Sequence, residues 1–99
     1  MGNTISGQEN LRNFIPFHID DYTNIEQFSV ITCVNYWNTD IEHAIILRIS
    51  QYNSNSGEQM YELWCDNGYF ARPMSQIGFF MGNDDQKKSL LASWKRRIS

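Results

Sequence analysis

The sequence predicts an α+β domain in which an antiparallel meander of four to five strands is packed on one face by a C-terminal amphipathic helix. Runs rich in β-branched and aromatic residues fill the middle of the chain, and apolar residues recur at helical spacing near its end. Strands and helices are therefore segregated along the chain, which is typical of α+β proteins. We expect one small domain over residues 1–99, with a flexible leader at 1–6, the sheet at 27–73 and the helix at 84–98.

The strands are predicted from four runs of β-branched and aromatic residues that are separated by polar residues with turn propensity. The pair Asn67-Gly68 suits a tight hairpin turn whose two central residues have positive φ. A turn centred there would place Cys65 opposite Phe70. Residues 76–82 form either a fifth short strand or an extended loop. The four predicted strands are residues 27–37, 42–52, 58–65 and 69–73.

Helix signals are present at both ends of the chain. Near the N-terminus, Ser6 followed by Glu9 fits a capping box, and Pro16 would stop a helix, so we predict a short helix near residues 7–14. The C-terminal helix has acidic residues at its start and basic residues at its end, which matches the helix dipole. Either Asn83 or Asp84 can cap it. Its apolar side chains form one stripe made of Leu90, Leu91, Trp94 and Ile98.

The charge of the chain is acidic overall but unevenly distributed. A net charge of −3 argues against nucleic acid as a partner, because a phosphate backbone attracts basic proteins. Residues 1–82 hold three arginines against nine acidic residues, whereas residues 83–99 hold five basic residues against two acidic ones. A surface that binds anions is therefore expected only on the C-terminal helix.

The chain opens Met1-Gly2-Asn3-Thr4-Ile5-Ser6, which matches the signal for N-myristoylation at Gly2. This leader resembles those of retroviral matrix proteins and of small accessory proteins of plant and animal viruses. The resemblance covers only these opening residues, and it implies membrane attachment without implying a fold. The alternative is an unmodified Gly2 followed by a capping serine.

A membrane role would need a second attachment signal. One myristoyl chain binds a membrane only marginally, with an association constant on the order of 10⁴ M⁻¹. The basic residues that could add affinity for an anionic membrane surface all lie on the C-terminal helix. The alternative is an ordinary packing helix whose basic residues complement the helix dipole. The residues expected to contact lipid head groups are Lys88, Lys95, Arg96 and Arg97.

Several predicted strands carry apolar residues on both faces, and one helix covers only one face. Either residues 10–24 and 74–82 wrap the second face, or another molecule covers it. A large exposed apolar patch usually marks an interaction surface, so a protein partner or a second copy of the chain is the alternative occupant.

Patterns that would indicate catalysis or a cofactor are absent from the sequence. Cys33 and Cys65 are too few for a disulfide framework, and we expect them to be buried in a reducing, cytoplasmic setting, although one bond between them is left open. A zinc site built from these cysteines and His43 would lack a close ligand pair and a fourth ligand. We therefore predict no catalytic residue, no metal site and no cofactor.

These observations favour a small non-enzymatic interaction protein, of the kind that viruses use as accessory proteins, recruited to the cytoplasmic face of a membrane by Gly2 and the basic helix. The alternative is a soluble inhibitor or immunity-type module with an unmodified N-terminus, in which an acidic sheet surface binds a protein partner. A thiol-dependent enzyme is the weakest hypothesis, because it would require Cys33 or Cys65 to have a low pKa.

Overall fold

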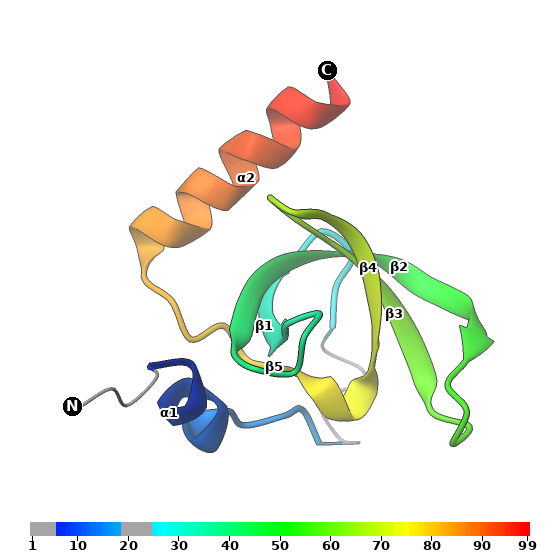
Figure 1. The fold of residues 1–99 in the computed structure, drawn as a ribbon. Coiled ribbons are helices and arrows are strands. Elements are labelled where there is room, and N and C mark those ends of the chain that lie inside the picture. Colours follow the sequence, from blue (N-terminus) through cyan, green and yellow to red (C-terminus); the bar gives the residue numbers. More distant parts are fainter. Residues whose placement is uncertain (1–5, 19–24) are drawn as a thin grey trace.

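The computed structural model describes residues 6–18 and 25–99, and it contains one five-stranded antiparallel sheet, a short N-terminal helix and a longer C-terminal helix (Figure 1). This architecture confirms the predicted α+β class. Gly2 and the rest of the leader before Ser6 lie outside the described residues. The elements are α1 (Ser6–Asn13), β1 (Val30–Val34), β2 (Ile41–Asn53), β3 (Gln59–Cys65), β4 (Gly68–Pro73), the 3₁₀ turn η2 (Met74–Gln76), β5 (Ile77–Gly78) and α2 (Asp84–Ile98).

The strand order is β4-β3-β2-β1-β5, so the first four strands form the predicted meander and β5 joins the far edge beside β1. Two pairs define that edge, Thr32 with Gly78 and Cys33 with Ile77. Only the three residues of η2 connect β4 at one edge of the sheet with β5 at the other. Because so short a connection cannot cross a flat sheet, the sheet curls until its two edges approach each other (Figure 1).

The Arg72 side chain links the two edges directly. Its Nε donates to the carbonyl of Val34 at 2.9 Å, and its Nη2 donates to the carbonyl of Asn35 at 2.6 Å. Val34 ends β1, the strand next to edge strand β5, whereas Arg72 lies on the opposite edge strand β4, so these bonds join the two sides of the curled sheet. Met74 in η2 is almost fully buried and fills the space below them.

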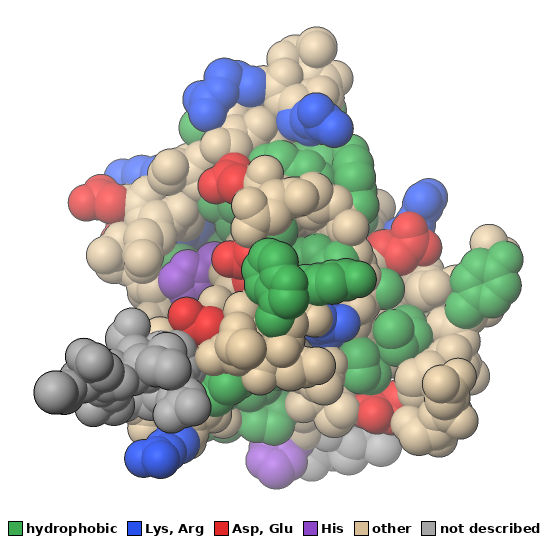
Figure 2. Space-filling model, viewed as in Figure 1, with side chains coloured by type: hydrophobic (Ala, Val, Ile, Leu, Met, Phe, Trp, Pro, Cys, Tyr) green, Lys and Arg blue, Asp and Glu red, His purple; other side chains and the backbone are tan. Residues whose placement is uncertain are grey.

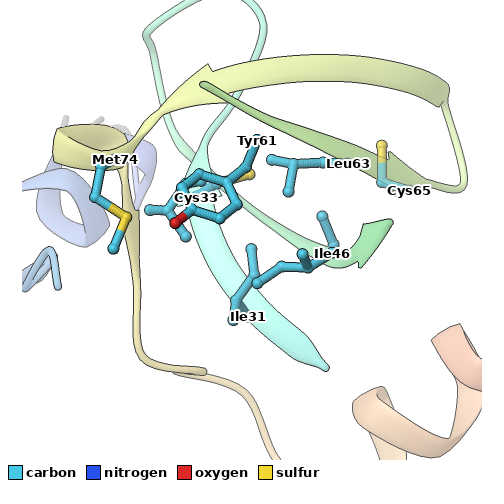
Figure 3. Close-up of a cluster of buried hydrophobic side chains, with 9 residues drawn as sticks. Ile31, Cys33, Ile46, Tyr61, Leu63, Cys65 and Met74 are labelled. Carbon is cyan, nitrogen blue, oxygen red and sulfur yellow. The ribbon is translucent and has the colours of Figure 1, made fainter. Parts of the chain in front are cut away.

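The curled sheet has an apolar cluster on each face, because side chains alternate between the faces along every strand. The inner cluster lies inside the curl (Figure 3). The outer cluster lies under α2, where Trp64 and Trp94 have ring centroids 5.2 Å apart. The inner cluster comprises Ile31, Cys33, Ala44, Ile46, Tyr61, Leu63, Cys65, Met74 and Ile77, and the outer one Val30, Ile45, Trp64 and Leu90.

The apolar surplus of the sequence is thus largely used within the chain. The second sheet face turns inward, and Phe17 and Ile25 from the N-terminal segment pack against it. Residues 10–24 and 74–82 were the predicted internal cover, and both regions contribute, through Phe17 in the first and through η2 and β5 in the second. The large apolar side chains that stay exposed are concentrated in turns and at strand ends rather than across a sheet face.

Helix α2 forms as predicted, with Asn83 as its cap. The Asn83 side chain accepts from the backbone amide of Gln86 at 2.8 Å, and the Gln86 side chain accepts from the amide of Asn83 at 2.9 Å. This reciprocal capping box satisfies two amides that have no partner within the helix. Leu90 is buried in the predicted stripe, but Ile98 is exposed because the helix extends past the sheet.

The N-terminal segment continues the sheet edge. The Asn10 side chain of α1 donates to Asp40 at 3.2 Å, and beyond the helix Phe17 donates to the carbonyl of Ile77 at 2.8 Å. Pro16 forms a bridge with Gly78, where a Cβ atom would collide with the Ile15 carbonyl. Gly78 is therefore required by the close approach of this segment. The capping side chains predicted at the start of α1 lie outside the described side chains.

Two local predictions were wrong. The first strand is only Val30–Val34, because a turn with Phe28 at a φ of 68° precedes it and a turn beginning at Asn35 follows it. In the second hairpin Cys65 pairs with Gly68, not with Phe70, so the turn is centred one residue earlier than predicted. Gly68 alone has positive φ there, at 122°. The register shifts by two residues, which keeps every side chain on its predicted face.

Candidate functional site

Two turns at one end of the sheet display aromatic side chains to solvent. The turn after β1 carries Tyr36 and Trp37, and the start of β4 carries Tyr69; their exposed fractions are 71%, 64% and 59%. The Tyr36 and Trp37 rings are in edge contact, with centroids 5.7 Å apart. Figure 2 shows apolar side chains standing out at the centre of this face, with carboxylates around them.

The turn between β1 and β2 is held by its own polar residues. The buried Asn35 side chain accepts from the Thr39 amide at 2.9 Å and donates to the Thr39 hydroxyl at 3.2 Å. Asn38 has a φ of 59°, a conformation that asparagine tolerates better than most residues. Together with the bonds from Arg72 to the carbonyls of Val34 and Asn35, these contacts fix the backbone of the turn that carries the two aromatic rings.

Glu42 on β2 ties the second turn to the sheet. Its Oε1 accepts from the Asn67 side-chain amide at 3.1 Å and from the Cys65 thiol at 3.6 Å. Asn67 lies in the β3–β4 turn, so this carboxylate sets where that turn stands relative to β2. Tyr69 follows the turn and meets Trp94 of α2, with ring centroids 6.5 Å apart. Both aromatic-bearing segments are therefore anchored at several points.

A hollow of about 260 Å³ lies between these two segments, and we call it the aromatic hollow. Glu42, Cys65, Asn67 and Gly68 complete its wall. Lysine and arginine do not line it. The four rings that line it belong to Tyr36, Trp37, Tyr69 and Phe70.

A second hollow of about 430 Å³ adjoins the first, between the β3–β4 turn and the first turns of α2. We call it the acidic hollow, because three carboxylates line it and no lysine or arginine does. The two hollows share Glu42, Cys65 and Asn67. A single bound segment could therefore contact both. The three carboxylates belong to Glu42, Asp66 and Asp85.

His43 and Cys65 line the acidic hollow without the electrostatics of a reactive pair. Burial raises the pKa of the Cys65 thiol from 9.0 to about 11, although backbone hydrogen bonds from Asn67 and Gly68 oppose the shift. Burial lowers the pKa of His43, with Glu42 and Asp40 acting in the opposite direction. At neutral pH both side chains are therefore mainly uncharged. Within the described residues the His43 Nε2 is buried without a hydrogen-bond partner, which fits a neutral ring against Phe80.

The strand order argues against a disulfide between the two cysteines and against a reactive pair of Cys33 with His43. Cys33 and Cys65 are both free and buried, and they lie on strands separated by β2. Two strand spacings alone amount to about 9–10 Å between Cα atoms, and the register adds an offset of two residues along the strands, whereas a disulfide needs less than about 7 Å. Burial also raises the pKa of Cys33. Cys33 pairs with Glu42 and His43 with Thr32, so Cys33 and His43 point to opposite faces of the sheet. Among the residues described, no three His, Cys, Asp or Glu side chains are arranged to hold a metal ion.

The basic residues predicted to contact a membrane are all exposed on α2. Lys95, Arg96 and Arg97 form its last turn, which we call the basic end of α2, and Lys88 lies nearer its start. Helix α1 lies on the side where α2 begins, and the basic end points away from it (Figure 1). Gly2 is outside the described residues, so its distance from these cations is not part of the structure. In residues 6–18 and 25–99, neither helix combines the length and the apolar content of a membrane span.

The sequence interpretation did not single out the aromatic hollow, since Tyr36 and Trp37 were assigned to a strand. The available signal was Asn35 and Asn38 on either side of them, because asparagine is typical of turns. The chain matches no family model, and comparisons with characterised proteins and with solved structures also give no match. The candidate site therefore depends on its own geometry.

Proposed function

We propose that this protein is an interaction module that binds a segment of a partner protein across the aromatic and acidic hollows. The observation that carries this proposal is the convergence of exposed Tyr36, Trp37 and Tyr69 on one hollow, from segments anchored by internal hydrogen bonds. Exposed tyrosine and tryptophan are enriched in protein-binding surfaces, where they give a large contact area and lose few rotamers on binding.

The anchoring of the two turns supports binding energetically. A surface that is already ordered loses little conformational entropy when a partner binds, so more of the contact energy remains as affinity. Asn35 and Glu42 supply this order through the contacts described above. The same aromatic side chains add little to the stability of the isolated chain, because more than half of the surface of each residue stays in solvent.

The charge of the site favours a basic partner segment. The carboxylates of Glu42, Asp66 and Asp85 line the hollows, and no lysine or arginine lies among the lining residues. A cleft lined by one sign of charge concentrates ligands of the opposite sign and speeds their association, most strongly at low salt. This form of the proposal corresponds to a protein-binding module with an acidic surface.

Membrane recruitment through Gly2 and the basic end of α2 is a second candidate. It is favoured by the exposure of Lys88, Lys95, Arg96 and Arg97 on a helix whose apolar face is already used against the sheet. Those cations therefore remain available for anionic head groups. The two candidates are compatible, since they use different residues.

Selection from a random peptide display library tests the first candidate. We expect the intact chain to retain peptides rich in lysine or arginine, and Trp37→Ala to weaken their binding about 30-fold, the value for loss of an aromatic hot spot worth about 2 kcal/mol. Tyr52→Ala is the matched control, because Tyr52 is 73% exposed and lines neither hollow. Equal binding by the Trp37→Ala and intact chains would overturn the proposal.

A further inference from the structure

We infer that the aromatic hollow binds one weakly hydrated organic cation, the guanidinium of an arginine or the ammonium of a methylated lysine in the partner segment. This inference rests on the proposed function and specifies its ligand. The face of an aromatic ring carries negative potential and attracts cations, and an arrangement of several rings is suited to cations that carry methyl groups or a delocalised charge.

The shape of the hollow suits one side chain rather than a flat contact. The rings of Tyr36 and Trp37 are set almost at right angles, with an interplanar angle of 80°. Tyr69 and Phe70 come from β4, so the rings belong to two segments that are distant in the strand order. The volume of about 260 Å³ is enough for one charged head group and part of its alkyl stem.

Glu42 supplies the opposite charge at the wall of the hollow. Its contacts with Asn67 and Cys65 both use Oε1, and no donor among the described residues is in contact with Oε2. The second oxygen can therefore accept from a ligand without breaking the contact that holds the β3–β4 turn. An apolar ligand would gain nothing from this carboxylate, whereas any cation would gain electrostatic attraction, and a cation that carries an N–H group would also gain a hydrogen-bond acceptor.

The chain already places a cation against one of the four rings. The Arg72 guanidinium lies 5.5 Å from the centroid of Phe70. Arg72 lines neither hollow, because its donors are directed to the carbonyls of Val34, Asn35 and Ala71. Arg72 therefore already uses one face of Phe70, and its positive charge, which lies outside the lining, opposes the attraction that Glu42 exerts on a bound cation.

A weakly hydrated cation fits better than an ordinary lysine. An unmodified ammonium is compact and strongly hydrated, and it needs three acceptors when it leaves water. The hollow offers it the Glu42 carboxylate and otherwise mainly ring faces. Guanidinium and methylated ammonium groups lose less hydration on entry, so the same rings bind them more favourably.

Nuclear magnetic resonance of the intact chain tests the inference with two small probes of equal shape, choline and the neutral alcohol 3,3-dimethyl-1-butanol. We expect choline to shift the indole resonance of Trp37 and to leave that of the buried Trp64 in place. The alcohol should need roughly tenfold higher concentration for the same shift, because it lacks the charge. N-methylguanidinium in a parallel titration distinguishes an arginine ligand from a methylated lysine.

Two variants separate charge from shape. Glu42→Gln keeps an acceptor for Asn67 but removes the charge, and it should weaken choline binding about tenfold without changing binding of the alcohol. Glu62→Gln is the control, because Glu62 lies on neighbouring β3 and lines neither hollow. Trp37→Leu removes a ring but keeps apolar bulk, so it should reduce choline binding more than alcohol binding.

Equal responses to choline and the alcohol, or a Trp37 resonance that neither probe moves, would overturn the cation site. If the probes fail in one of these ways while library peptides still bind in a Trp37-dependent way, the cation site is refuted and the interaction module stands. If the peptides and both probes all fail to bind, both proposals fall.

Discussion

Substituting Arg72 by methionine should open the curled sheet, because Arg72 is the side chain that joins its two edges. Methionine keeps most of the apolar stem and removes the donors to Val34 and Asn35. Each hydrogen bond from a charged group contributes about 1.5–3 kcal/mol, and these bonds are partly buried, so we expect a loss of about 3 kcal/mol in the free energy of unfolding. A domain of this size has about 5–15 kcal/mol in total.

Arg48→Met provides a matched control on the same sheet. Arg48 forms an ion pair with Glu62 at 3.0 Å, but its side chain is 71% exposed. Exposed pairs contribute about 0–1 kcal/mol, because water screens the charges and holding the long side chains costs entropy. The two variants remove the same kind of side chain. They differ mainly in how buried the arginine is and in whether its guanidinium binds backbone carbonyls across the curl or a carboxylate on the adjacent strand.

Urea unfolding followed by tryptophan fluorescence measures both variants. With a slope of about 1–3 kcal/mol per molar urea, the Arg72→Met midpoint should fall by about 1–3 M, and the Arg48→Met midpoint by no more than about a third of that shift. Equal shifts for the two variants would refute the reasoning. The pairing of β5 with β1 and the short η2 connection would then account for closure without Arg72.

Two further predictions concern the Cys65 thiol and Gly2. In a Cys33→Ala variant, alkylation of Cys65 at pH 8 should be about 100-fold slower than in the urea-unfolded chain, because raising the pKa from 9.0 to about 11 reduces the thiolate fraction by that factor. The alkylation rate of the folded chain should keep rising up to about pH 11, and a plateau near pH 9 would contradict this. In a cell containing N-myristoyltransferase, the intact mass of the protein should show one myristoyl group that Gly2→Ala abolishes. Binding of the acylated protein to liposomes, measured by flotation, should then depend on the basic end of α2. An unmodified glycine would leave the membrane candidate without support.

Elements whose signals are local could be predicted from the sequence. Helix α2 was predicted with its limits, and its cap was narrowed to Asn83 or Asp84, because the capping residue and the dipole-matching charges lie within the helix or next to it. Strands β2 and β3 were predicted to within one residue, since their β-branched runs are flanked by clear turn residues.

The extent of β1 could not be predicted from residue composition. Phe28, Tyr36 and Trp37 all favour strands, yet they lie outside Val30–Val34. The strand begins after a turn in which Ser29 donates to Glu26, and it ends where the Asn35 side chain takes over the hydrogen bonding. Strand propensity describes a half-buried pleated surface, and these three aromatic side chains are not placed on one.

The register of the second hairpin depended on a contact distant in sequence. The Asn67-Gly68 pair indicated the right place for a turn, but only Gly68 takes a positive φ. Asn67 instead directs its side chain to Glu42, 25 residues away. A prediction from the dipeptide alone therefore located the turn and gave its centre one residue too late.

The candidate site depends on the same distant contacts that the sequence could not reveal. Its rings are brought together because β4 curls back toward the end of β1. Arg72 holds the β1–β2 turn through its bonds to two backbone carbonyls, and Glu42 holds the β3–β4 turn through its bond from Asn67. Closure of the sheet and the shape of the aromatic hollow are consequently coupled, so a change that opens the sheet should also weaken binding there. Arg72→Met lies outside the lining of the hollow, and a drop in choline affinity in that variant would demonstrate this coupling.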